Sequence, residues 1–283
     1  MSRTPSVDLY QILLGLLEQV PESMVTTPHE LAVALGDPVA VNAVARALKR
    51  EDFRRFSGKT VTTPGSDVPV FSDFVSDGPL KRLAGLQREI AKRVIREDDF
   101  TEAMRLAGSD AAYRGDVAYA ACVVMDGDRG LLEISSASEL VRFPYIPGYL
   151  MFREAPVIKA AARLVSGFDL LFVNGHGVAH SRGCGLASCV GLALDAPTIG
   201  VAGRPLVGDV GERRGRWAPL TYDGEVVGAE VDVGGSRICV SIGHRISLET
   251  SVEMVLKMVS GGRFPEPLRR AHVEARKTAR RIR

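Results

Sequence analysis

The sequence predicts an α/β protein in which a mixed sheet is flanked by helices, preceded by a small, mainly helical domain. Three observations support this fold class: closely spaced helix starts before residue 54, a Pro-, Gly- and Ser-rich stretch over residues 54–79, and alternating strand and helix patterns after it. The 283 residues are 46% hydrophobic, which is ample for two domains. We therefore expect one domain over residues 1–75 and a second over residues 76–283.

The first 53 residues carry the pattern of three short helices. The first helix has an apolar stripe at helical spacing, formed by Leu9, Ile12, Leu13, Leu16 and Leu17. Thr27-Pro28-His29-Glu30 is a capping box with Pro at the first helical position, and Asp37-Pro38 repeats the cap-then-proline signal. Compact helices followed by a polar stretch predict a helix-turn-helix unit with a wing.

The second domain begins with a new amphipathic helix that includes Leu83. Apolar runs over residues 117–125, 170–174 and 198–202 predict core strands. Residues 225–243 indicate a hairpin that turns at Gly234-Gly235, and helical spacing resumes at Leu248.

The charge of the chain is unevenly distributed. Its formal net charge is +2, but residues 269–283 hold seven Arg or Lys and one Glu. This basic tail either neutralises nucleic-acid phosphates or is the solvated face of a last helix. Because the sequence has neither a secretory signal nor an apolar run of about 18 residues, we expect a soluble, cytoplasmic monomer with no membrane partner.

Polar residues stand at the ends of several predicted strands, where a strand fixes a side chain and the loops beyond leave room for a ligand. Asp110 lies just before a strand, Glu154 lies in FREAP, Asn174 ends the strand LLFVN, and His244 lies between a strand and a helix. Each also fits a purely structural role, as a turn cap, a helix start, an Asn-Gly turn or a packed histidine. Taken singly, the residues leave both interpretations open.

Six segments of the second domain together carry a more specific pattern: GSDAAYRGD, FPYIPGYLMFREAP, VNGHGVAHSRGCGLAS, PTIGVA, SIGHRISLE and FPEP. Over residues 80–272 they resemble the endonuclease V family. The resemblance implies a ribonuclease H-like fold and a metal-dependent DNA repair endonuclease that nicks strands near deaminated bases such as inosine. It implies Mg²⁺ as cofactor, with Mn²⁺ as a substitute, and DNA containing deaminated bases as partner, and it leaves RNA open as a substrate.

The resemblance also assigns roles to the strand-end residues. Asp110 and Glu154 match catalytic, metal-binding acids, and His244 matches a catalytic histidine near the reacting phosphate. Asn174 stands where the family has a metal-binding aspartate, and Gly203 stands where it has a lysine. Replacing the carboxylate by an amide removes one negative charge, worth about 4 kcal/mol at most for a distance of ~4 Å and a dielectric of ~20. These departures leave an alternative, a catalytically weakened or inactive binding protein for deaminated or distorted nucleic acid.

Contacts with DNA are likewise implied by the resemblance. Tyr145 corresponds to an aromatic wedge that fills the gap left in the DNA double helix. Gly175 and Gly177 let the protein backbone approach a flipped base. The remaining residues expected to contact the base or the strand are Gly148, Leu150, Arg153 and His180.

The first domain has a resemblance of its own. Residues 20–50 are similar to the winged-helix DNA-binding part of O6-alkylguanine-DNA alkyltransferases. The alkyl-accepting Pro-Cys-His-Arg motif is absent and no cysteine precedes Cys122, which excludes methyl transfer to a cysteine here. Arg46, on the last of the three helices, is expected to lie on DNA phosphates, with a structural docking role as the alternative.

Overall fold

A computed structural model of the chain describes residues 7–62, 68–100 and 102–281. Internal contacts divide these residues into two packing units, which we describe separately. The helical unit consists of residues 7–86 and 142–153, and the sheet unit consists of residues 87–141 and 154–281. The boundary expected from composition lies at residues 75/76, whereas packing extends the helical unit to residue 86 and adds the FPYIPG segment to it.

The helical unit contains the three helices expected from its sequence: α1 (Leu9–Glu18), α2 (Pro28–Ala34) and α3 (Val41–Ala47). The Thr27 side chain caps α2 by accepting a hydrogen bond from the Glu30 backbone N–H at 3.2 Å, as the capping box predicts. Asp37 caps the 3₁₀ turn Pro38–Ala40 in the same way. A further 3₁₀ helix, Glu51–Lys59, follows α3. The apolar stripe of α1 is buried at four of its five expected positions, Leu9, Leu13, Leu16 and Leu17.

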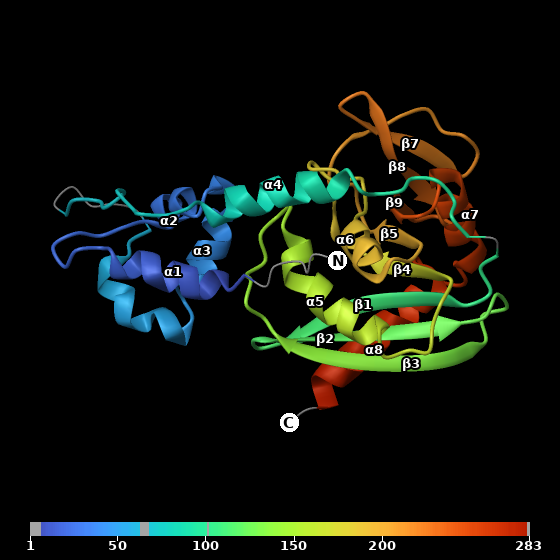
Figure 1. Ribbon diagram of the computed structural model, residues 1–283, viewed down its shortest axis with the longest axis horizontal. Coiled ribbons are helices and arrows are strands. Elements are labelled where there is room, and N and C mark those ends of the chain that lie inside the picture. Colours follow the sequence, from blue (N-terminus) through green and yellow to red (C-terminus); the bar gives the residue numbers. More distant parts are fainter. Residues whose placement is uncertain (1–6, 63–67, 101, 282–283) are drawn as a thin grey trace. The chain divides into compact units, whose positions relative to one another are not determined.

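The sheet unit is built on a nine-stranded mixed sheet in the order β3-β2-β1-β4-β5-β9-β8-β7-β6 (Figure 1). The pairs β1–β4 and β4–β5 are parallel, and the other neighbouring strands are antiparallel. The strands are β1 (Leu106–Arg114), β2 (Val117–Met125), β3 (Leu131–Leu140), β4 (Leu170–Asn174), β5 (Thr198–Ala202), β6 (Asp209–Val210), β7 (Trp217–Tyr222), β8 (Glu225–Asp232) and β9 (Arg237–His244). The predicted core strands and hairpin are confirmed.

The helices beyond the first three are α4 (Pro79–Ala91), α5 (Leu150–Ala162), α6 (Leu186–Leu194), α7 (Leu248–Met258) and α8 (Glu266–Arg281). Of these, α8 packs closely on β1 and β2 through a stripe of buried alanines, Ala271, Ala275 and Ala279. A Cβ atom on Gly108 of β1 would lie 2.2 Å from the backbone carbon of Pro267, so only glycine lets the start of α8 come this close. This close approach fixes α8 beside the middle of β1.

The core of the sheet unit is formed by the apolar runs that the sequence displays. Leu170 and Phe172 of β4, Ile199 of β5 and Val240 of β9 are fully buried in one cluster. The four cysteines are buried free thiols, and burial raises the pKa of Cys122 to about 12, so this thiol stays protonated at neutral pH. None of the helices in the described ranges is both long and apolar enough to cross a membrane.

Candidate active site

Asp110 lies within β1, not just before a strand as the sequence suggested. Its side chain is only 5% exposed and is held by three neighbours. Its Oδ1 atom accepts hydrogen bonds from the Ala111 backbone N–H at 2.8 Å and from Asn174 Nδ2 at 3.0 Å. Its Oδ2 atom lies 2.7 Å from Nδ1 of His272 on α8. A buried acid is thus shared by two neighbouring strands and one helix.

Strand register explains why Asp110 and Asn174 meet. In the parallel pair β1–β4, Ser109 stands opposite Val173, so the next residues along each strand are level with one another. Asn174 is the last residue of β4, where the apolar run ends. The structure therefore brings these two predicted site residues into direct contact.

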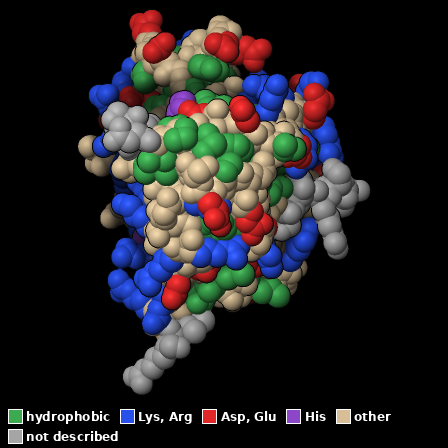
Figure 2. Space-filling model, turned by 90° about the vertical axis from the view of Figure 1, so that its left-hand side faces the viewer, with side chains coloured by type: hydrophobic (Ala, Val, Ile, Leu, Met, Phe, Trp, Pro, Cys, Tyr) green, Lys and Arg blue, Asp and Glu red, His purple; other side chains and the backbone are tan. Residues whose placement is uncertain are grey.

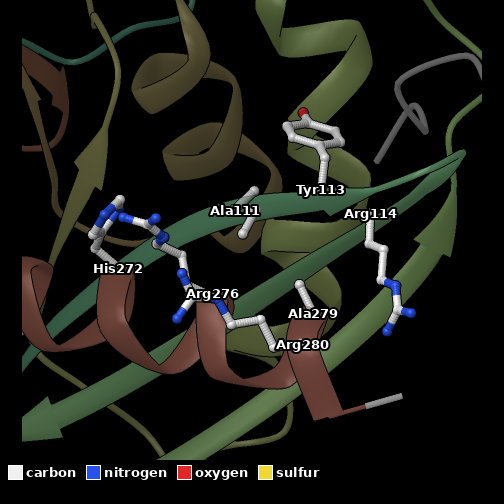
Figure 3. Close-up of a pocket in the computed structure, with 8 residues that line it drawn as sticks. Ala111, Tyr113, Arg114, His272, Arg276, Ala279 and Arg280 are labelled. Carbon is white, nitrogen blue, oxygen red and sulfur yellow. The ribbon is translucent and has the colours of Figure 1, made fainter. Parts of the chain in front are cut away.

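Glu154 approaches β1 from the other side of the sheet. Its Oε1 atom accepts a hydrogen bond from the Tyr113 hydroxyl at 2.7 Å. Side chains alternate between the faces of a strand, so Tyr113 points away from the face that carries Gly108 and Asp110. Figure 3 shows the Tyr113 ring rising from β1 on the side opposite to α8. Helices on the two faces of β1 thus each contribute a polar side chain, Glu154 from α5 and His272 from α8.

Sequence patterns do not single out His272, although it lies in the segment that follows FPEP. The signal that could have found it is the alanine stripe of α8, because His272 directly follows Ala271 and so stands at the edge of the buried face. Its side chain is 50% exposed while Asp110 beneath it is buried, so the histidine connects the buried acid to solvent.

His244 is placed elsewhere on the sheet. It pairs with Thr198 at the start of β5, whereas Asn174 pairs with Val201 near the end of β5. Three residues along a strand separate the two levels by about 10 Å. His244 Nδ1 accepts a hydrogen bond from the Ile95 backbone N–H at 3.2 Å, and burial holds the pKa of His244 below its ordinary value. The structure brings His272, and not His244, to Asp110.

The glycines of VNGHG are tightly enclosed, Gly177 by backbone and Gly175 by a side chain. A Cβ atom on Gly177 would lie 1.8 Å from the Ile242 carbonyl oxygen, and one on Gly175 would lie 3.1 Å from Leu186. His180 is buried, and its Nδ1 atom accepts a hydrogen bond from the Arg182 backbone N–H at 3.1 Å. Packing of this loop on β9 and α6 accounts for the glycines, and their approach to a base stays a prediction.

The other residues expected to contact DNA belong to the helical unit. Tyr145 is 54% exposed, as a wedge must be, and Gly148 has a left-handed backbone with a φ of 77°. Leu150, the first residue of α5, is partly buried. Arg153 Nη1 donates a hydrogen bond to the Phe143 carbonyl oxygen at 2.6 Å and so braces the start of the FPYIPG segment.

Arg46 is exposed on α3. Figure 2 faces the left-hand side of the view in Figure 1 and shows Lys and Arg side chains interspersed with acidic and apolar ones. Charge alone does not single out a nucleic-acid surface on that face.

At Gly203 a guanidinium from another part of the chain lies beside the backbone. The Arg263 guanidinium lies 3.5 Å from the position that a Gly203 Cβ would take, and it donates hydrogen bonds to the Gly203 carbonyl and to the Arg237 carbonyl. The Arg204 carbonyl accepts a hydrogen bond at 2.9 Å when His176 Nε2 carries the proton. A guanidinium from Arg263 thus covers the position where a lysine was expected.

The donor set around Asp110 suits a hard cation, because carboxylate and amide oxygens are what Mg²⁺ prefers and it commonly uses only one or two carboxylates. Asp110 and Asn174 offer such oxygens next to each other, whereas Glu154 is bonded to Tyr113 on the other face of β1. Among residues 7–62, 68–100 and 102–281, no group of three or more His, Cys, Asp or Glu side chains is arranged to hold a metal ion. The set fits a magnesium-type site of low charge and not a closed cage of acids.

These features define a class of protein: a mixed-sheet α/β protein whose central strand carries a buried acid, flanked by a second acid and a histidine from helices on its two faces. The endonuclease V family model matches residues 88–273. The chain therefore belongs to the endonuclease V family of nucleases, and the predicted family and the predicted mixed sheet flanked by helices are confirmed.

Individual relatives agree with this assignment. The chain is 44% identical to endonuclease V of Methanopyrus kandleri over 203 residues, covering 70% of this chain and 88% of the relative. It is 32% identical over 298 residues to a bifunctional methyltransferase/endonuclease of Picrophilus torridus, covering 94% of this chain and 95% of that one.

Solved structures show the same fold. The crystal structure of Streptomyces avermitilis endonuclease V is 35% identical with a TM-score of 0.65, covering 70% of this chain and 92% of that chain. Ciona intestinalis endonuclease V, in complex with a 24mer DNA containing an inosine followed by a ribo-adenosine, is 25% identical with a TM-score of 0.67. The match covers 73% of this chain and all of that one.

Proposed function

We propose that this protein is a magnesium-dependent endonuclease that nicks nucleic-acid strands near deaminated bases, inosine above all. The observation that carries the proposal is the contact set of Asp110, a buried carboxylate bonded to both Asn174 and His272. Membership of a nuclease family and likeness to a relative bound to inosine-containing DNA support it.

In this proposal Asp110, Glu154 and Asn174 provide the oxygen atoms that hold the metal. Mg²⁺ bound there would polarise the scissile phosphate and activate water. His272 takes the role that sequence alone gave to His244. With the His272 Nδ1 proton directed at Asp110, its Nε2 atom is available to the phosphate or the leaving group. Tyr113 holds Glu154 in place through its hydroxyl.

The test is cleavage of a labelled strand that carries one inosine, beside the same strand with adenine, in Mg²⁺ and in Mn²⁺. We expect a nick only in the inosine strand, and none with Asp110→Asn. Tight binding without product in either metal, with cleavage only after Asn174→Asp, would reject the enzyme and establish the binding protein instead. Paired strands that differ only at the 2′-hydroxyl beside inosine separate a DNA from an RNA preference.

For the helical unit we propose binding to duplex DNA flanking the lesion. A relative that is similar over nearly the whole chain is named for both a methyltransferase and an endonuclease, while this unit has no cysteine to accept an alkyl group. Exposed Arg46 on α3 and the nearby Lys49 are the cations that would meet phosphates. Reversing both charges should weaken binding to long duplexes more than to short ones, and equal weakening of both would refute this role.

A further inference from the structure

The last helix, α8, distributes its charges unequally around its axis. Its two acids are both engaged: Glu266 pairs with Arg269 and Arg270, and Glu274 pairs with Lys277. Within the described part of the chain no carboxylate pairs with Arg276 or Arg280. Two exposed guanidinium groups are therefore left without a counter-charge on the same side of the helix as His272.

These two arginines line a groove between α8 and the end of β1. The groove has a volume of about 480 Å³, and the residues that line it are Ala111, Ala112, Tyr113, Arg114, His272, Arg276, Ala279 and Arg280. Figure 3 shows His272, Arg276 and Arg280 in succession along α8, with Arg114 on the facing strand. Alanines form much of its wall, so its chemical character comes from three guanidinium groups and one imidazole.

The spacing gives the groove a direction. His272, Arg276 and Arg280 follow one another at intervals of four residues, which place them on one face of the helix about 6 Å apart. His272 contacts the buried Asp110, so one end of the groove is the candidate active site. The cations then lead away from that site along α8 for two further helical turns.

We propose that this groove binds the sugar–phosphate backbone of a nucleic-acid strand on one side of the reacting phosphate. Guanidinium groups bind phosphate oxygens through two hydrogen bonds at once, and a row of them suits a chain of phosphates better than a single small anion. Alanine walls have no groups to read base edges, so the contact is independent of sequence. This inference rests on the proposed function in one respect, because the reacting phosphate is defined by the proposed nuclease activity.

The first experiment measures binding without cleavage. Affinity for an inosine-free single strand is measured in EDTA over a range of salt concentrations, for the wild type and for Arg276→Glu/Arg280→Glu. Losing two phosphate contacts should reduce the slope of log K against log salt by about 1.5. The matched control, Arg88→Glu/Lys257→Glu, makes the same change in net charge at exposed sites on α4 and α7 and should leave most of the slope intact.

The second experiment tests the direction of the groove with strands shortened on either side of the inosine. The deficit of the Arg276/Arg280 variant should vanish when the strand is shortened on one side and persist when it is shortened on the other. Equal loss of slope in both double variants, or a deficit that survives both truncations, overturns the groove assignment. Because both experiments measure binding in EDTA, where no strand is cleaved, failure here leaves the proposed nuclease activity standing, and absence of nicking leaves the groove standing.

Discussion

Replacing Asn174 by aspartate tests the central contact of the site. The Asn174 amide donates to Asp110 Oδ1 at 3.0 Å, and aspartate would put a second negative charge at that distance. Two unit charges at this separation repel by about 5 kcal/mol at an effective dielectric of 20, and the lost hydrogen bond to a charged group removes about 2 kcal/mol more. Solvent and side-chain rotation relieve much of this, so we expect a net loss near 2 kcal/mol without metal.

Thermal unfolding in EDTA and in increasing Mg²⁺ is the appropriate assay. In EDTA the Asn174→Asp variant should unfold about 4–8 °C below the wild type. Mg²⁺ should reverse the order, because a full carboxylate binds the cation more tightly, and each tenfold gain in affinity adds about 1.4 kcal/mol at saturating metal.

Two variants serve as controls for this experiment. Asn42→Asp makes the same chemical change at an exposed site on α3 and should be neutral in both conditions. Asn174→Ala should lose the hydrogen bond without gaining metal affinity. If the Tm of Asn174→Asp equals that of the wild type in EDTA and Mg²⁺ raises it no further than in the wild type, the side chain at 174 does not face the metal. The proposed metal site would then be wrong.

Three further predictions concern the histidines and a helix cap. His272→Ala should lower the nicking rate by about 10²–10⁴-fold with little change in Tm, and a normal rate would remove it from the mechanism. His244→Asn should nick at the normal rate. Because burial holds the pKa of His244 down, the wild type should lose stability as the pH falls below about 6.5, and the variant should lose less. Curves of Tm against pH that run parallel for the two proteins would contradict this. Burial alone would raise the pKa of Asp98, but hydrogen bonds lower it, and the strongest of these comes from the Ser247 backbone N–H. Asp98→Asn should therefore lower the free energy of unfolding by about 1 kcal/mol or less above pH ~5, and should not lower it at a pH where the Asp98 carboxyl is protonated. A Tm difference that stays constant across pH would show that the charge of Asp98 is not the cause.

The sequence displays the central strands clearly because they are covered on both faces. Residues 117–125, 170–174 and 198–202 are apolar runs, and the strands begin and end at those residues. β1 is the exception, since it carries Gly108 for the approach of α8 and Asp110 for the site. Its composition of small and polar residues is what function requires, and this composition hides the strand.

His244 and His272 show how far sequence motifs alone can identify the residues of the site. His244 ends β9 in a segment that matches the family, whereas His272 lies within α8 beyond the matching segment FPEP, and neither segment by itself shows which histidine contacts Asp110. Register does, because His244 lies level with Thr198 while Asn174 lies level with Val201. The contact between His272 and Asp110 depends on how α8 docks on β1, which is a long-range packing property that spacing within one segment does not record.

The FPYIPG segment offers a separate prediction, because its packing partners lie in the helical unit. Tyr149 is fully buried, and its hydroxyl donates to Asp37 Oδ2 at 2.6 Å and lies 3.2 Å from the Leu80 carbonyl oxygen. Asp37 Oδ1 meanwhile caps the turn before α3. One carboxylate therefore ties the helix start to the segment that carries exposed Tyr145.

Tyr149→Phe removes only the hydroxyl and takes one donor from the partly buried Asp37 carboxylate and the buried Leu80 carbonyl, which should cost about 1–3 kcal/mol. Hydrogen exchange should quicken in residues 143–149, and affinity for inosine strands should fall while the rate at saturating substrate holds, since the wedge is loosened but Asp110 is untouched. Tyr10→Phe is the matched control, because within the described residues the Tyr10 hydroxyl makes no hydrogen bond and its ring keeps the Arg50 guanidinium at 4.3 Å. If the two variants exchange and bind alike, Asp37 does not position the wedge and the helical unit acts on DNA only through its own surface.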